Sequence, residues 1–179
     1  YLKNLNQFPE ADISINAMVN LMMCYANLDD RLSMQMTAEY LGERFSKTSV
    51  APLGFLGLGK YYFDKNDVAM YTYVYNAYLK YFPQHDRAAA ILFTLAGLRK
   101  KAGDEAGAMA YYQRIVENYS KDQYYPKALS QMAWGSFAAS NYEGAVKGFT
   151  VYIAEAQPSM DRALAQLSLA DSCRQLGRY

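Results

Sequence analysis

Histidine and cysteine, which often act as metal ligands, bases or nucleophiles, are rare in this chain: one histidine and two cysteines. His85 lies between Gln84 and Asp86 in a stretch that reads as a turn, so we expect a solvated side chain rather than a general base. Cys24 and Cys173 are far apart in the sequence and lie in apolar stretches, which predicts two buried free thiols. Metal sites made of cysteine and histidine need several ligands at short spacing. We therefore expect no metal site.

The sequence also lacks the residue spacing of a phosphate-binding loop, a nucleophile motif or a pair of catalytic carboxylates. The segment Gly54–Gly59 is rich in glycine, but no Lys-Ser or Lys-Thr pair follows it, and small residues that let helices approach explain it better. No nucleophile motif of the G-x-S-x-G type accompanies His85. Glu105, Glu117 and Glu143 are scattered, so nothing pairs them as acid and base. We expect a protein that is not an enzyme and needs no cofactor.

The composition predicts a folded protein without a strong charge bias. Of the 179 residues, 52% are apolar and 20% are charged, which excludes a disordered chain. Lys and Arg number 18 against 17 Asp and Glu, which argues against binding to nucleic acid or to an anionic membrane surface. The longest uncharged stretch, 13–28, is too short and too polar to span a bilayer.

An internal repeat organises the sequence. Small residues recur every 37 residues at Ala96, Ala133 and Ala170, and turn residues recur at Gly103, Ser140 and Gly177. Units also close alike, as in Gln7-Phe8-Pro9 and Tyr81-Phe82-Pro83. A fixed period of this length is typical of stacked helical repeats. The sequence predicts a single array over 1–179 whose last unit keeps only its first helix; its units are 12–47, 48–84, 85–121, 122–158 and 159–179.

Each unit reads as two helices joined by a short polar turn. Apolar residues recur at intervals of three and four on both sides of each turn, as one face of a helix requires. Ser140 and Glu143 have the spacing of a capping box. The stretch 71–75 alternates like a strand, but the repeat register and the helical spacing of Tyr71, Val74 and Tyr78 favour a helix.

The small residues at Ala96, Ala133 and Ala170, with Gly103 and an aromatic at Tyr112 in the same frame, resemble the tetratricopeptide repeat (TPR) signature. Antiparallel helices approach closely only where a small side chain lies at the crossing. In the first two units Met22 and Leu58 stand at that position, so we expect those units to pack more loosely or to be divergent. The resemblance implies an all-α fold, a right-handed α-solenoid of tandem TPR-like helix-turn-helix repeats.

The 37-residue period and closures such as Tyr81-Phe82-Pro83 are similar to one branch of the family, the TPR proteins of the bacterial envelope. This resemblance implies a location in the bacterial periplasm or at the outer membrane, with the cytoplasm as the alternative. The chain starts without Met and stops within the repeat pattern, so we expect a fragment of a longer protein.

In TPR arrays the first helix of each unit lines a concave groove that binds a protein or peptide. Carrying those positions across the repeats gives twelve candidate groove residues: Asn16, Asn20, Met23, Phe55, Tyr62, Phe93, Lys100, Ser130, Trp134, Phe137, Asp171 and Arg174. The aromatic members would anchor a peptide or partner helix, and Lys100 and Arg174 would read its polar groups. Trp134, the only tryptophan, has the alternative role of packing between units.

Two other functions compete with a peptide-binding scaffold. A structural spacer in a large assembly would use the convex face and the repeat ends, and would leave the groove empty. Helical repeats of similar length also bind RNA, but the near-neutral charge disfavours that class. We expect a protein or peptide partner, no nucleic acid, and no transmembrane segment in this chain.

Overall fold

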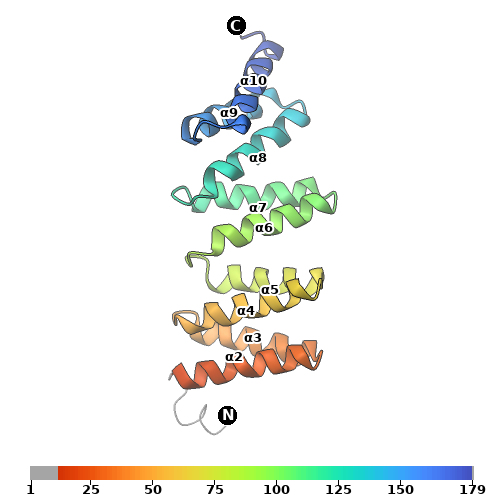
Figure 1. The fold of residues 1–179 in the computed structure, drawn as a ribbon, viewed down its shortest axis with the longest axis vertical. Coiled ribbons are helices and arrows are strands. Elements are labelled where there is room, and N and C mark those ends of the chain that lie inside the picture. The colour runs from red at the N-terminus through yellow and green to blue at the C-terminus, as the bar shows by residue number, and fades with distance from the viewer. Residues whose placement is uncertain (1–11, 179) are drawn as a thin grey trace. The chain divides into compact units, whose positions relative to one another are not determined.

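The computed structural model describes residues 12–178, so the predicted closure at Gln7–Pro9 lies outside the described residues. The described part contains nine α-helices and no strand, which confirms the all-α prediction (Figure 1). The chain divides into two compact units, 1–88 and 89–179, and each has its own set of packed helices. The single array over 1–179 and the right-handed solenoid stay predictions.

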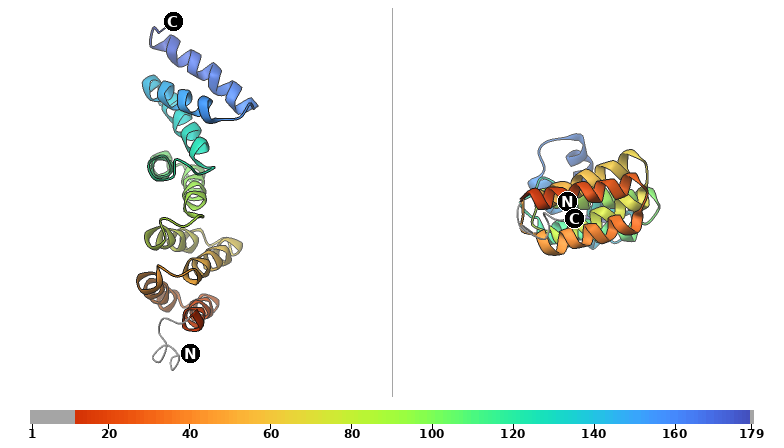
Figure 2. Two further views of the ribbon diagram at one scale, coloured as in Figure 1. Left: turned by 90° about the vertical axis from the view of Figure 1, so that its left-hand side faces the viewer. Right: turned by 90° about the horizontal axis from the view of Figure 1, so that it is seen from below.

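Unit 1 is built from two antiparallel helix pairs. The first pair is α2 (Asp12–Asn27) with α3 (Arg31–Phe45), and the second is α4 (Val50–Asp64) with α5 (Val68–Tyr81). The pairs pack through α2 against α4 and through α3 against α5, as the end-on view of the helices shows (Figure 2). The core between them is dense: Met22, Leu41 and Leu58 are fully buried. The expected loosening at Met22 and Leu58 is therefore not seen.

Unit 2 continues the same pattern with α6 (Ala88–Lys101), α7 (Glu105–Asn118), α8 (Tyr125–Ala138), α9 (Tyr142–Glu155) and α10 (Met160–Gln175). Within this unit α7 packs on α8, α8 on α9, and α9 on α10. One core cluster of this unit joins the last three helices around Ala133, Phe149 and Ala165. The helix boundaries fall inside the predicted repeat units, and only one helix occupies 159–178.

The turns inside the helix pairs repeat the same backbone geometry every 37 residues. A residue with positive φ ends each of these turns: Asp29 (55°), Asn66 (56°), Gly103 (78°) and Ser140 (56°); Gly177 (66°), after α10, continues the spacing. The residue after it then caps the next helix in each of the four turns, accepting a hydrogen bond from a backbone N–H, as at Asp67 and Asn141. The predicted capping box at Ser140 is therefore wrong by one residue, because Ser140 adopts the left-handed conformation and Asn141 is the cap.

Of the small residues predicted at helix crossings, Ala133 lies at a close approach of two helices. A Cβ added to Gly148 of α9 would stand 2.8 Å from the Cβ and 3.1 Å from the Cα of Ala133 on α8. In unit 1, Val19 lies over Gly54 and the Tyr75 ring lies over Gly59. The glycine-rich segment 54–59 thus serves helix packing, and it lies within α4.

Three further features bear on expectations from the sequence. The stretch 71–75 is helical, within α5. No helix in the described residues is long and apolar enough to cross a membrane. Both cysteines carry free thiols, but Cys24 is exposed and Cys173 half-buried, so the prediction of two buried thiols is wrong. Cys24 lies on the exposed face of α2, because Ile15, Met22 and Ala26 form the face of that helix that packs into the core.

Candidate functional site

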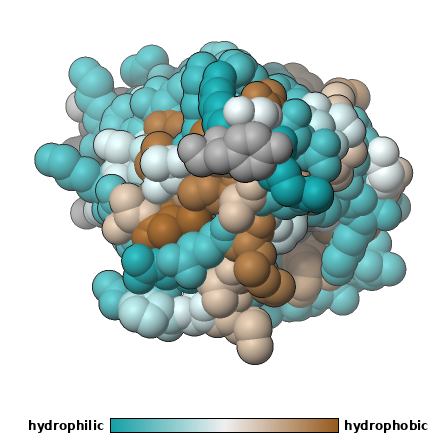
Figure 3. Space-filling model, turned by 90° about the horizontal axis from the view of Figure 1, so that it is seen from above, coloured by the Kyte–Doolittle hydropathy of each residue, from teal (hydrophilic) through white to brown (hydrophobic). Residues whose placement is uncertain are grey.

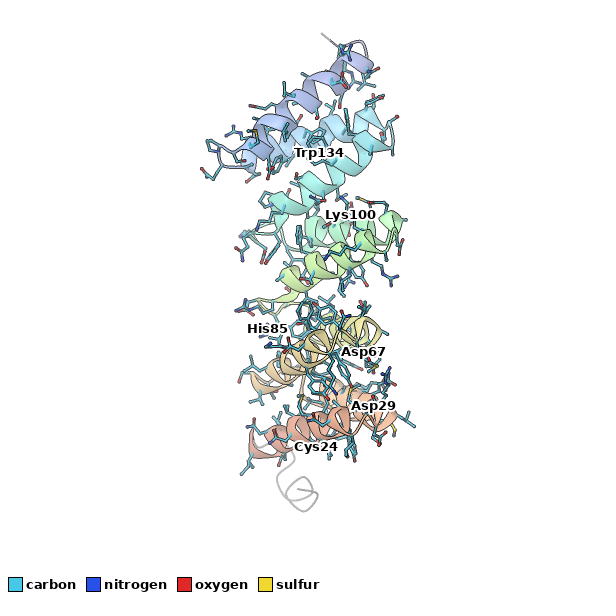
Figure 4. All side chains as sticks on the ribbon, turned by 45° about the vertical axis from the view of Figure 1, so that its right-hand side comes forward. Cys24, Asp29, Asp67, His85, Lys100 and Trp134 are labelled. Atoms are coloured by element: carbon cyan, nitrogen blue, oxygen red, sulfur yellow. The ribbon has the colours of Figure 1, made fainter. Side chains whose placement is uncertain are left out.

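In unit 2 a hollow opens between the end of α6, the start of α7 and the C-terminal half of α8. Its volume is about 770 Å³, within the range of ligand pockets. It unites two of the predicted groove residues, Lys100 on α6 and Trp134 on α8 (Figure 4). Its remaining lining comes from α7, α8 and the turn that follows α8: Glu105, Ala106, Met109, Gly135, Ser136, Ala138, Ala139 and Asn141.

The lining is apolar because α7 and α8 present small residues and one methionine there. The turn at Gly103 lets α7 start directly after α6, where Asp104 caps it by accepting from the N–H of Gly107 at 2.8 Å. One turn further, Met109 lies across Gly135: a Cβ at position 135 would come within 2.7 Å of the Met109 Cε. Glycine therefore admits the flexible thioether at this wall of the hollow.

Trp134 forms the aromatic wall and is itself held by the core. Its ring lies 5.0 Å from that of Phe149 and 6.2 Å from that of Phe137, both in edge-to-face geometry. Phe149 is fully buried, whereas Trp134 is only partly buried. One side of the residue therefore packs on α9, within its own predicted repeat unit 122–158, and the residue also lines the hollow.

Charge at the hollow comes from its α6 and α7 edges. The Lys100 ammonium donates to the neutral amide oxygen of Gln131 at 3.0 Å. Its neighbour Arg99 instead forms an ion pair with Asp104, at 3.3 Å. Glu105 stands in the first turn of α7, where a helix N-terminus favours an acidic side chain. One cation and one anion thus border an apolar floor.

The other predicted groove residues of unit 2 do not reach this hollow. Phe93 is half-buried between the rings of Tyr112 and Tyr124, at 5.4 and 5.2 Å. Burial raises the pKa of Tyr112, and the nearby charge of Glu105 adds to that shift. Ser130 is buried in α8, and Phe137 packs against Phe149.

The two polar candidates on α10 pair with each other. The Arg174 guanidinium donates from Nε to Oδ1 of Asp171 at 3.1 Å, one turn away on the same helix. This ion pair raises the pKa of Arg174. To bind polar groups of another protein, as predicted, Arg174 would have to give up its ion pair with Asp171.

In unit 1 the predicted groove residues divide between surface and core. Asn16 and Asn20 are exposed on α2, and Met23 is half-buried there. Phe55 is fully buried against Phe82, with ring centroids 5.2 Å apart.

Tyr62 is also a core residue, only 2% exposed, and burial raises the pKa of its hydroxyl. Since Phe55 and Tyr62 have no exposed surface to offer, the prediction that they anchor a partner in the groove is wrong.

The wrong prediction for Phe55 and Tyr62 came from aligning the repeats one residue out of register. The positive-φ turns at Asn66 and Gly103 show that α4 and α6 are related by 37 residues. The assignment of Phe55 and Tyr62 beside Phe93 and Lys100 used a spacing one residue longer, and one residue rotates a side chain by about 100° around a helix.

In the correct register Lys60 and Phe63 of unit 1 match Gly97 and Lys100. Both side chains are exposed, with Phe63 61% accessible. The sequence reasoning missed them, together with the α7 lining residues Ala106 and Met109. The polar turns, aligned first, would have given the register.

The chain matches no protein-family model. No curated protein matches it either. Its function is therefore inferred from the residues and their geometry.

The histidine and the two cysteines lie in separate elements: Cys24 in α2, His85 after α5 and Cys173 in α10. His85 lies in the loop after α5 and is half-buried rather than fully solvated, with its Nδ1 at 2.6 Å from the Tyr78 hydroxyl and 2.7 Å from Oδ1 of Asp86. Among the described residues no group of three or more histidine, cysteine or acidic side chains is placed to hold a metal ion.

Proposed function

We propose that this chain is a non-catalytic scaffold that binds a segment of another protein, an extended peptide or a helix, through the hollow of unit 2. The hollow carries the proposal because it joins an apolar floor, a partly exposed tryptophan and one charged side chain at each of two edges. Buried aromatic side chains beside small residues are the usual anchor sites of protein interfaces. From the resemblance to TPR proteins, we extend the proposal to a concave groove and a bacterial envelope assembly.

The test is capture of partners by the full chain from a bacterial envelope extract. Ala138→Phe fills the hollow from an exposed position on α8, without opening the core. Ala154→Phe adds the same bulk at an exposed position of α9 that does not line the hollow. We expect the wild type and Ala154→Phe to retain a partner that Ala138→Phe loses. Equal capture by both variants would refute the hollow as the binding surface.

One observation favours the second candidate, a structural spacer that makes contacts through its repeat ends. On α10, Met160, Leu164 and Leu167 are 76%, 44% and 69% exposed, and their spacing puts them on one face. Figure 3 looks onto the end that carries α10 and shows apolar side chains gathered among polar ones. Capture that survives Ala138→Phe and is lost in a Leu164→Glu, Leu167→Glu variant would favour the spacer.

A further inference from the structure

The charge around the hollow of unit 2 is not symmetric, and this bears on the partner. The last turn of α6 carries three consecutive cations, Arg99, Lys100 and Lys101. Arg99 is paired with Asp104. Lys100, which lines the hollow, donates to a neutral amide, that of Gln131. A carboxylate would be a stronger acceptor for this ammonium than the amide oxygen, because both members of the hydrogen bond would then be charged.

The opposite edge limits where such a carboxylate can lie. Glu105 borders the hollow from the first turn of α7 and would repel a second acid placed beside it. An acidic group is therefore favoured only on the α6 side, next to Lys100. Between the two edges, Trp134, Met109 and the small residues of α7 and α8 offer contact mainly to apolar atoms.

Resting on the proposed function, we infer that the bound segment carries a large apolar side chain with an acidic residue beside it. The apolar side chain enters the hollow against Trp134 and Met109. The neighbouring carboxylate replaces Gln131 as the acceptor for Lys100. A volume of about 770 Å³ accommodates a large side chain together with part of the peptide backbone.

The experiment is a selection of random 12-residue peptides, displayed on phage, against the full chain. We expect enriched peptides to share an aromatic or long aliphatic residue with Asp or Glu within two positions. Their binding is then measured through the fluorescence of Trp134, the only tryptophan. In Lys100→Glu the affinity for these peptides should fall roughly tenfold. Replacing the peptide acid by Lys should recover most of that loss in Lys100→Glu, and only there.

The outcomes separate this inference from the function on which it rests. Enriched peptides that need the apolar residue but bind Lys100→Glu as tightly as the wild type would overturn the acidic requirement and leave the scaffold proposal standing. Peptides that bind Ala138→Phe as well as the wild type, or no enrichment at all, would overturn both. A gain in affinity on Lys100→Glu without the swapped peptide would also contradict the inference. Circular dichroism establishes that each variant is folded.

Discussion

Asp67 uses its two carboxylate oxygens for two different helices. Oδ1 accepts from the backbone N–H of Met70 at 3.1 Å and caps α5, while Oδ2 accepts from the Arg31 guanidinium at the start of α3, at 2.9 Å. Arg31 also reaches Oδ1 of Asp29 at 3.2 Å. The turns of two successive helix pairs in unit 1 are thereby tied together by one arginine.

Substitutions at Asp67 should separate the two roles. Asp67→Asn retains a capping oxygen and removes the ion pair, which is partly exposed, so we expect a loss of less than about 1 kcal/mol. Asp67→Ala removes the cap as well and should cost about 1–2 kcal/mol. Native-state hydrogen exchange of the α4 and α5 amides measures both changes within unit 1. Equal effects of the two variants would contradict the double role.

The surroundings of two glycines in unit 2, Gly148 on α9 and Gly97 on α6, predict that an added methyl is harmful at the first and helpful at the second. In Gly148→Ala the new Cβ meets the Cα and Cβ of Ala133, so we expect destabilisation by about 1–2 kcal/mol in spite of the gain in helix propensity. Gly97→Ala meets no atom within 4 Å and should stabilise by up to about 1 kcal/mol. Urea unfolding followed by Trp134 fluorescence compares them. Stabilisation by Gly148→Ala would show that the helices can separate freely there.

Trp134 should respond differently to removal and to replacement by a smaller ring. Trp134→Ala deletes the ring packed on Phe149, and we expect a loss of about 2–3 kcal/mol, below the value for a fully buried tryptophan. Trp134→Phe retains an aromatic contact and should cost about 1 kcal/mol. Thermal unfolding followed by circular dichroism checks both. A negligible loss in Trp134→Ala would mean that the ring belongs to the hollow alone.

The free energy of unfolding of unit 1 should decrease at alkaline pH, because buried tyrosines ionise there. Burial, helped by the nearby Glu39, raises the pKa of Tyr73 to about 12, and burial next to Tyr75 raises the pKa of Tyr71 as well. Because the unfolded chain ionises these phenols near pH 10, their contribution to stability is complete below pH 10 and is lost as the pH rises above it, for Tyr73 between pH 10 and about pH 12.

Absorbance at 295 nm, with circular dichroism at the same pH, follows this transition. In Tyr73→Phe the alkaline unfolding should shift to higher pH, since one ionisable phenol is removed. Tyr40→Phe, an exposed position on α3, provides the control and should leave the midpoint unchanged. Normal ionisation of all tyrosines near pH 10 in the folded protein would refute the prediction.

The sequence predicted the helices well and the surface residues less well, for a physical reason. Helix pairs follow from spacing that tolerates a shift of one or two residues, because a helical face spans several positions. The direction of a single side chain does not tolerate it: the slip that placed Phe55 and Tyr62 in the groove rotated them into the core. In unit 2, where Gly103 and Ser140 gave the register directly, Lys100 and Trp134 do line one hollow.

Other features depended on contacts that no pattern in the sequence encodes. The α7 wall of the hollow arises because Met109 lies over Gly135, a contact between residues in different repeats. Ser140 was expected to cap α9, but a polar residue before an asparagine can adopt the left-handed conformation and leave the cap to its neighbour.

The turns with positive φ, which recur every 37 residues from Asp29 to Gly177, also bear on how such a chain changes its length. The four turns at Asp29, Asn66, Gly103 and Ser140 join their helices through the same positive-φ residue, so two copies of the gene that recombine at these turns, out of register by one repeat, would still encode complete helices. The length would then grow or shrink by 37 codons at a time, with matching backbone geometry at the recombined turn. Deletions of other sizes would rotate the following helix and expose its apolar face.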